Sequence, residues 1–151
     1  MSRMRSGFKL SGKLKLIVIR KGKKVLERTY KNIIVNAGIA KIAGLIGNIV
    51  SGGWTYVAIG TGTTSESASD TALGNEYARV SASVTRKTTN VTNDTVEYDA
   101  VFNITSSVTI SEAGIFDAGS GGTLLARRTF SGLPLEAGDQ LRIIWDIVVS
   151  R

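Results

Sequence analysis

Hydrophobic and polar side chains alternate along most of this 151-residue chain, and a two-residue period predicts β-strands. The clearest run is 95–104, where every even position from Val96 to Ile104 is apolar, while Glu97 and Asp99 between them are charged. A helix could not bury such a pattern on one side. On the same reasoning we predict further strands at 13–19, 25–30, 54–59, 77–87, 108–116, 123–130 and 140–149, and an extended run at 32–35.

For two of these strands the sequence also predicts how they lie in a sheet. The strand at 77–87 is predicted to pair with 95–104 across a turn at 90–94. In the strand at 140–149 one face is wholly apolar, whereas Ile144 and Val148 interrupt the polar face. We therefore expect this last strand to be central in its sheet or buried at a subunit contact, and we take Ile144 and Val148 as candidate self-association residues.

A short helix is predicted after the extended run at 32–35. We expect Asn36 to be its N-cap and Gly47 to adopt the left-handed conformation beyond its end. Because Gly38 and Gly44 inside it lower the helix propensity, the helix must be held by packing or by close backbone approach. Four apolar residues recur at helical spacing and are predicted to dock on a sheet: Ile39, Ile42, Ala43 and Ile46.

Eight extended runs, seventeen glycines and one proline favour a mainly β fold, either an antiparallel β-sandwich or a barrel-like domain with one short α-helix. A parallel α/β fold is disfavoured because the chain has too few helices to connect parallel strands. Residues 1–12 lack a sustained pattern and are predicted to be a flexible basic arm. Residues 13–151 are predicted to be a single β-rich domain.

The composition argues against catalysis and for an absence of cofactors. The chain contains neither cysteine nor histidine, which removes the commonest general base near neutral pH and the commonest transition-metal ligands. Glu97 and Asp99 could help to ligate calcium, but no EF-hand pattern surrounds them and a solvated strand face explains them better. We predict a non-enzymatic protein with no catalytic residues, no cofactor and no metal site.

The glycine-rich run from Gly60 to Thr64 follows a predicted strand, and its amides could cradle a phosphate. The third glycine of a dinucleotide fingerprint is replaced by Ser65, and the Gly-Lys-Ser/Thr of a P-loop is absent. A structural turn is therefore favoured over phosphate binding.

Positive charge is concentrated at the start of the chain. Residues 1–31 contain eleven Lys and Arg against Glu27 alone, a net +10, whereas 32–151 contain eight against eleven Asp and Glu, a net −3. Such a segment suits an acidic partner, which could be nucleic acid, a membrane surface or an acidic protein lattice; it could also be a lysine-protected edge hairpin. The candidate docking residues are Arg3, Arg5, Lys9, Lys13, Lys15, Arg20, Lys21, Lys23 and Lys24.

Neither a secretory signal nor a membrane span is expected. The first residues lack an apolar core segment, and no apolar run approaches the ~20 residues that cross a bilayer. We expect synthesis in a host cytoplasm and no membrane partner.

Several stretches of the chain resemble a recurring cassette in small virion structural proteins of tailed viruses, which serve as head-decoration, head-fibre or tail-fibre components. The resemblance is carried by residues 36–47, 56–64 and 70–76, and more weakly by 111–116, 122–127 and 138–145. It implies a role at the virion surface or in attachment.

The resemblance and the charge together predict a capsid decoration, or cement, protein that docks on the outer shell through its basic arm and hairpin. Its partner would be the major capsid protein or another virion protein, and its location the virion. The resemblance alone suggests a homo-oligomer, with a trimer as the expected number. One alternative is a tail fibre or baseplate adaptor protein. Another is an OB-like nucleic-acid-binding protein with Phe8 and Tyr30 stacking on bases, which is disfavoured because no RNA-recognition, zinc-finger or helix-turn-helix signature is present.

Overall fold

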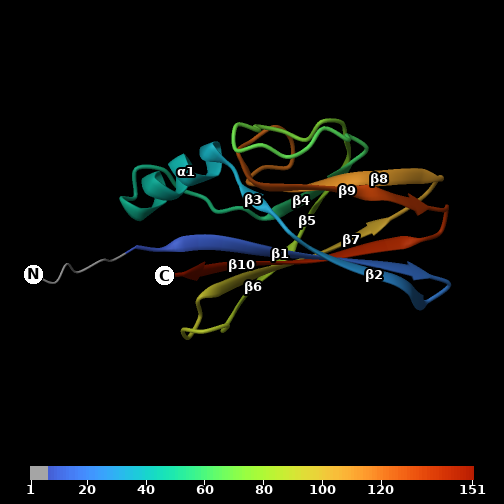
Figure 1. Ribbon diagram of the computed structural model, residues 1–151, viewed down its shortest axis with the longest axis horizontal. Helices are drawn as coiled ribbons and strands as arrows, with labels where there is room; N and C mark the ends of the chain where they lie inside the picture. The colour runs from blue at the N-terminus through green and yellow to red at the C-terminus, as the bar shows by residue number, and fades with distance from the viewer. Residues whose placement is uncertain (1–6) are drawn as a thin grey trace, which may run out of the picture.

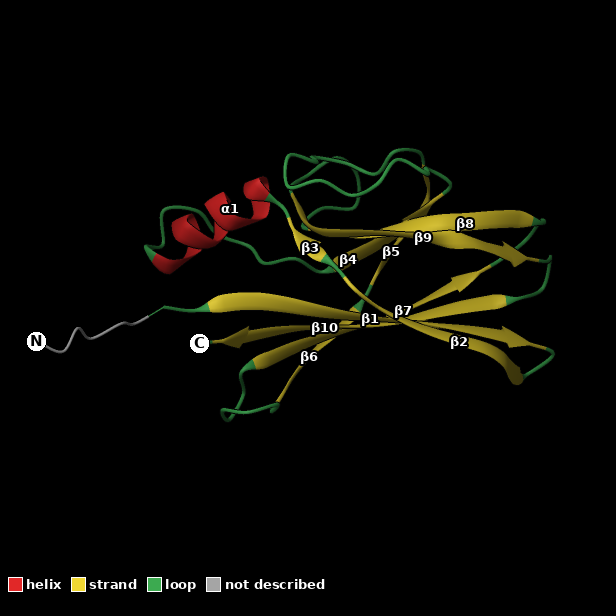
Figure 2. Ribbon diagram, viewed as in Figure 1, coloured by secondary structure: helices red, strands yellow, loops and turns green. Residues whose placement is uncertain are grey.

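The computed structural model describes residues 7–151, which form two antiparallel five-stranded sheets packed face to face (Figure 1, Figure 2). This confirms the predicted mainly β sandwich with one short helix. The elements follow in the order β1 (Lys9–Arg20), β2 (Lys23–Lys31), β3 (Ile33–Ile34), α1 (Asn36–Ile46), β4 (Tyr56–Gly60), β5 (Glu76–Ser81), β6 (Ser83–Lys87), β7 (Thr95–Asn103), β8 (Val108–Phe116), β9 (Leu124–Leu135) and β10 (Gln140–Ser150).

The strand order places β10 at the centre of its sheet, as its two-sided apolar pattern predicts. One sheet runs β2-β1-β10-β7-β6 and the other β3-β9-β8-β4-β5. The inward side chains of both sheets form the main core, in which Trp145 of β10 is fully buried. The even positions of 95–104 also face inward, so the alternation in that segment is confirmed.

The sandwich is linked along both of its edges. At one edge the chain passes from β2 to β3 through Asn32, and at the other it passes from β5 to β6 through Ala82. Each crossover joins an edge strand of one sheet directly to an edge strand of the other. The two sheets therefore have covalent connections at both sides, as in a flattened barrel.

The second crossover corrects the prediction of one strand at 77–87 paired with 95–104. Only β6 pairs with β7, whereas β5 pairs with β4 in the opposite sheet, where Val80 lies opposite Val57. At the bend, the Ala82 amide donates a 2.8 Å hydrogen bond to the Thr55 carbonyl. The alternation of apolar and polar residues continues through this bend. The apolar side chains of β5 and of β6 face the space between the two sheets, although the two strands belong to different sheets.

The helix docks on β9 through a glycine. A side-chain carbon at Gly38 would lie 3.0 Å from the Cα and carbonyl oxygen of Leu125, closer than an ordinary van der Waals contact, so glycine lets the helix approach β9 without displacing its backbone. Gly38 is the buried position of the helix. The predicted dependence on close backbone approach is thus confirmed.

Three details of the predicted helix are wrong. Val35 is the N-cap and makes no side-chain cap hydrogen bond, while Asn36 is already helical. Gly47 has φ −88°, and the left-handed conformation falls instead on Asn48, at φ 54°. Of the face predicted to dock, Ile42 packs against the core, but Ile39 is 55% exposed and Ile46 is 75% exposed, because the close contact at Gly38 turns the rest of that face away from β9.

The first strand begins earlier than the predicted Lys13. Lys9 to Gly12, which the sequence assigned to the arm, lie in β1 and pair with β10. The arm that remains as a prediction is therefore shorter, and its residues 1–6 lie outside the part of the chain that the structure describes.

Candidate assembly surface

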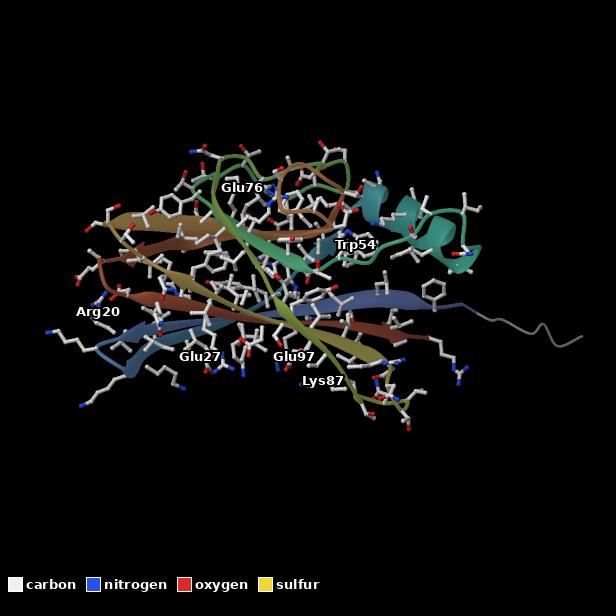
Figure 3. All side chains as sticks on the ribbon, turned by 180° about the vertical axis from the view of Figure 1, so that it is seen from behind. Arg20, Glu27, Trp54, Glu76, Lys87 and Glu97 are labelled. Carbon is white, nitrogen blue, oxygen red and sulfur yellow. The ribbon has the colours of Figure 1, made fainter. Side chains whose placement is uncertain are left out.

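The basic hairpin β1–β2 is the candidate docking element from the sequence, and its turn is tightly specified. Arg20 lies opposite Lys23, so Lys21 and Gly22 form a two-residue loop. Both loop residues have positive φ, 52° and 76°, as a type I′ hairpin turn requires. The turn lies at the end of the sandwich far from α1, where Figure 3 labels Arg20 well away from Trp54.

The cations of this turn differ in how strongly they are held. Arg20 donates two hydrogen bonds of 2.9 Å to the carboxylate of Asp139, so its charge is committed to the fold. Lys24 makes an exposed ion pair of 3.3 Å with Glu27. Lys21 and Lys23 are exposed, and among the described residues no carboxylate is recorded within ion-pair distance of them. Their charges are available to an external anion.

Three more candidate residues lie on the outward face of β1. Lys9 and Lys13 are exposed and Lys15 is half-buried. Lys13 has Lys31 of β2 on one side and Asp146 of β10 on the other, so a positive strip follows β1 and β2 beside an acidic one. The candidates Arg3 and Arg5 lie outside the described residues.

The acidic strip is largely neutralised by its own neighbours. Lys87 donates hydrogen bonds of 2.9 Å to Glu97 and 3.3 Å to Asp146, and Arg142 binds Asp99 in a bidentate pair (Figure 3 labels Lys87 and Glu97). Burial, with the adjacent Glu97, raises the pKa of Asp146. Hydrogen bonds from Asp146 and Lys87 lower the pKa of Glu97. The carboxylates once considered for calcium therefore already have protein partners.

The proposed self-association residues are not strongly exposed. Ile144 and Val148 lie on the outward face of β10 and are half-buried by the strands on either side. Ile144 lies between Lys15 and Asp99 in the strand register. Their role in self-association stays a prediction.

The glycine-rich segment 60–75 binds a carboxylate of the protein itself. The amides of Gly62, Gly74 and Asn75 each donate a 2.7 Å hydrogen bond to Glu112, which is fully buried on β8. A side-chain carbon at Gly62 would collide with this carboxylate. Of the run Gly60 to Thr64 that was compared with a phosphate cradle, the Gly62 amide therefore holds Glu112, together with the amides of Gly74 and Asn75.

Arg127 of β9 completes this buried cluster. Its guanidinium lies 2.9 Å from Glu112 and 2.9 Å from Asp70, and it also donates to the Thr64 carbonyl at 2.9 Å. Burial opposes ionisation of Glu112, but the amide and guanidinium donors outweigh it and lower the pKa of Glu112. The sequence gives no local signal for this role of Glu112, because its partners lie far from it along the chain. The cluster anchors the segment 60–75 to the sheet.

The aromatic residues considered for base stacking have other contacts. Tyr30 stacks on Phe130 with ring centroids 5.5 Å apart, and the Arg128 guanidinium lies 5.0 Å from the Tyr30 ring. Phe8 is 60% exposed and precedes β1, whereas Tyr30 lies opposite Leu14 in the middle of that strand. The two rings do not form a shared platform for nucleotides.

Comparison with known proteins identifies the class. The family model described as podophage GP4 fiber I protein gp80 matches residues 48–148, about two thirds of the chain, beginning directly after α1. No curated protein matches the chain. Among the described residues, no helix is long and apolar enough to span a membrane.

The match confirms the resemblance to tailed-virus structural proteins and the location in the virion. It also favours the fibre alternative over capsid decoration, and a structural family of this kind implies a non-enzymatic role in association with other virion proteins. The chain belongs to the podophage GP4 fibre I protein family, a family of virion fibre proteins of tailed phages.

Proposed function

We propose that this protein is a non-enzymatic building block of the phage fibre and that the basic hairpin β1–β2 docks it on an acidic surface of a neighbouring virion protein. The observation that supports the proposal is the pair of exposed cations, Lys21 and Lys23, at a tight two-residue turn at one end of the sandwich. Ion pairs at such a rim contribute modest affinity, but they steer association and select for an acidic partner.

The distribution of charge supports this direction of docking. Residues 1–31 carry a net +10 and the remaining residues a net −3. The acidic residues of the same sheet are largely paired with Lys87 and Arg142, so the hairpin is the more available charged surface. In this proposal residues 13–151 act as one unit and the preceding basic arm adds contacts to the same partner.

Incorporation into virions tests the hairpin. The variant Lys21→Glu with Lys23→Glu changes the net charge by four units, and a control with Arg86→Glu, Ser51→Asp and Ser120→Asp changes it equally at exposed positions away from the turn. Each variant is supplied in trans to a phage lacking its own copy, and the protein is quantified in purified particles. We expect the control to be incorporated normally and the hairpin variant to fall by about ten-fold or more. Equal incorporation of both variants rejects the hairpin as the docking element.

Truncation tests the arm separately. Because Lys9 to Gly12 belong to β1, the deletion is limited to residues 1–6 so that the strand is preserved. We expect the truncated protein to keep its melting temperature and to lose affinity for the particle. If the truncated protein is incorporated into particles as well as the full chain, the arm has no docking role and the hairpin alone remains as the proposed docking element.

Labelling of intact particles decides between the two virion locations. An antibody or gold label on this protein is expected on the fibre. A label distributed over the capsid faces would instead support the decoration role inferred from the sequence. Sedimentation equilibrium of the purified protein tests the trimer that the resemblance suggests.

A further inference from the structure

An apolar groove lies at the end of the sandwich opposite the hairpin turn. It occupies about 400 Å³ between the helix and the first residues of β1. In Figure 2 the helix extends over the position where β1 begins and β10 ends. Most of the side chains that line the groove are large and apolar: Phe8, Leu10, Ile34, Ile39, Ile42 and Ile46.

Several of these side chains are in solvent although the chain has a well-formed core. Phe8 is 60% exposed, Ile39 55% and Ile46 75%. Just beyond the helix, Ile49 is also 83% exposed. A gathering of large apolar side chains on one surface is typical of a binding site.

The first four residues of β1 have an unpaired edge beside this groove. On one side β1 pairs with β10 from Lys9 to Ile19, but on the other side β2 covers it only from Lys13 onward. The chain leaves β2 after Lys31 and crosses to the other sheet, so β2 never reaches the stretch Lys9–Gly12. Within the described residues, no other backbone hydrogen bond is recorded for this stretch.

An unpaired strand edge next to apolar pockets is the arrangement that accepts an added strand. Main-chain hydrogen bonds provide affinity, and pockets for every second side chain provide selectivity. In this stretch Leu10 points inward while Lys9 and Ser11 are exposed. A strand added here would alternate in the same way, with one set of side chains against the groove and the other beside Lys9.

The charges at this end favour an acidic occupant that is not a copy of this chain. Lys9 is the charged residue that lines the groove. In the adjoining hollow Arg151 lies with Phe8, and the carboxylate of Asp94 there already accepts hydrogen bonds from the amides of Thr89, Asn90 and Val91. A second copy would present the same cations at the same edge. Acidic side chains on the occupant would instead complement Lys9.

We propose that the edge at Lys9–Gly12 and the adjoining groove bind an extended segment of another virion protein by strand addition. Apolar side chains at alternate positions of that segment enter the groove, and acidic side chains between them face Lys9. The site lies at the far end of β1 from Lys21 and Lys23, so it is independent of the docking proposed for the hairpin turn.

Peptide binding to the full-length protein tests this proposal. The probes are short synthetic peptides with valine at alternate positions and glutamate, serine or lysine between them. By fluorescence anisotropy we expect the glutamate peptide to bind most tightly and the lysine peptide to bind least. On binding, the amide NMR signals of Lys9 to Gly12 should shift.

Backbone and groove variants separate strand addition from unspecific adhesion. Methylation of every second peptide amide should abolish binding in one frame and preserve it in the other, because only alternate amides face the partner strand. The variant Ile39→Ser with Ile46→Ser should weaken binding about ten-fold or more. The control Val25→Ser with Val101→Ser, at positions 53% and 42% exposed outside the groove, should leave it unchanged.

Opposite results overturn the proposal. These are failure of the glutamate peptide to bind, equal binding to the groove and control variants, or equal loss in both methylation frames. Self-association of the protein that disappears in the Ile39→Ser, Ile46→Ser variant would assign the groove to a second copy and reject the proposed occupant.

Discussion

Trp145 Nε1 donates a 2.6 Å hydrogen bond to Oδ1 of Asn32. The contact joins the central strand of one sheet to the crossover that carries the chain into the other. A fully buried indole thus fixes the point at which β2 ends, and so it also fixes where the unpaired edge of β1 begins.

Replacement of Trp145 should be severe. Trp145→Ala leaves a cavity in the core and is expected to lower the free energy of unfolding by about 3–5 kcal/mol. Trp145→Phe should cost less, because it retains much of the packing while leaving the Asn32 carbonyl without its donor, a loss of about 1–3 kcal/mol. Urea denaturation followed by circular dichroism measures both, and an unchanged midpoint for Trp145→Ala would contradict the core placement.

The buried Glu112–Arg127 pair should depend on both partners. Removing either one, by Glu112→Gln or Arg127→Met, leaves the other without its main counter-charge, so each is expected to cost about 3–5 kcal/mol. The double variant should cost clearly less than the sum. Lys24→Met, which breaks an exposed pair, serves as the control and should change stability by less than about 1 kcal/mol. Strict additivity of the two single changes would show that the pair is not coupled.

A methyl group at Gly38 should loosen the helix from β9. Gly38→Ala improves helix propensity by about 1 kcal/mol, but the added carbon meets the Leu125 backbone and cannot be accommodated by a side-chain movement. We expect a net loss of about 1–3 kcal/mol. Gly47→Ala is the matched control, since its nearest contact is at 3.5 Å and its φ is negative; thermal unfolding should show no loss for it. A Gly38→Ala variant as stable as the wild type would show that the helix is not held by this contact.

Acid should weaken the fold through Asp139. The hydrogen bonds from Arg20, assisted by the Glu136 amide, lower the pKa of Asp139 from 3.8 to about 2. Since the unfolded state binds its proton first, this stabilisation is complete above about pH 4 and is lost as the pH falls toward 2. Asp139→Asn should therefore flatten the dependence of unfolding free energy on pH in that window. Wild-type and variant proteins with parallel slopes between pH 4 and 2 would contradict this assignment.

The strands were the most predictable part of the fold because their cause is local. Alternation placed the strand at 95–104, and the apolar Ile144 and Val148 on the second face of 140–149 indicated either a central strand or a subunit contact. The structure shows the central position, with both side chains half-buried. The pattern did not reveal the bend at Ala82. The same alternate residues face the core before and after the bend, so the change of sheet leaves no break in the alternation. The helix was predicted from its period, but its buried side was not, since Gly38 docks by having no side chain.

The candidate sites also differ in whether the sequence could predict them. The hairpin turn and its cations could be located from the sequence, because Gly22 lies between two predicted strands and the four cations around it fall within residues 20–24. The Glu112 cluster could not, since its partners come from a loop and a strand far along the chain. Gly12 illustrates the difficulty at a single position. It falls in the predicted flexible arm, yet it lies in β1, where a side chain would collide with that of Asn32.

The crossover at Asn32 also limits how far a second molecule can extend the sheet along β1. The edge of β1 from Lys13 onward is already occupied by β2, and the chain turns into the other sheet only after Lys31. The short gap at Lys9–Gly12 can accommodate one guest strand, after which the ladder has no room to continue past Lys13. At this edge the length of the joint is therefore set by the fold itself, which suits a component that must meet its neighbour in one register.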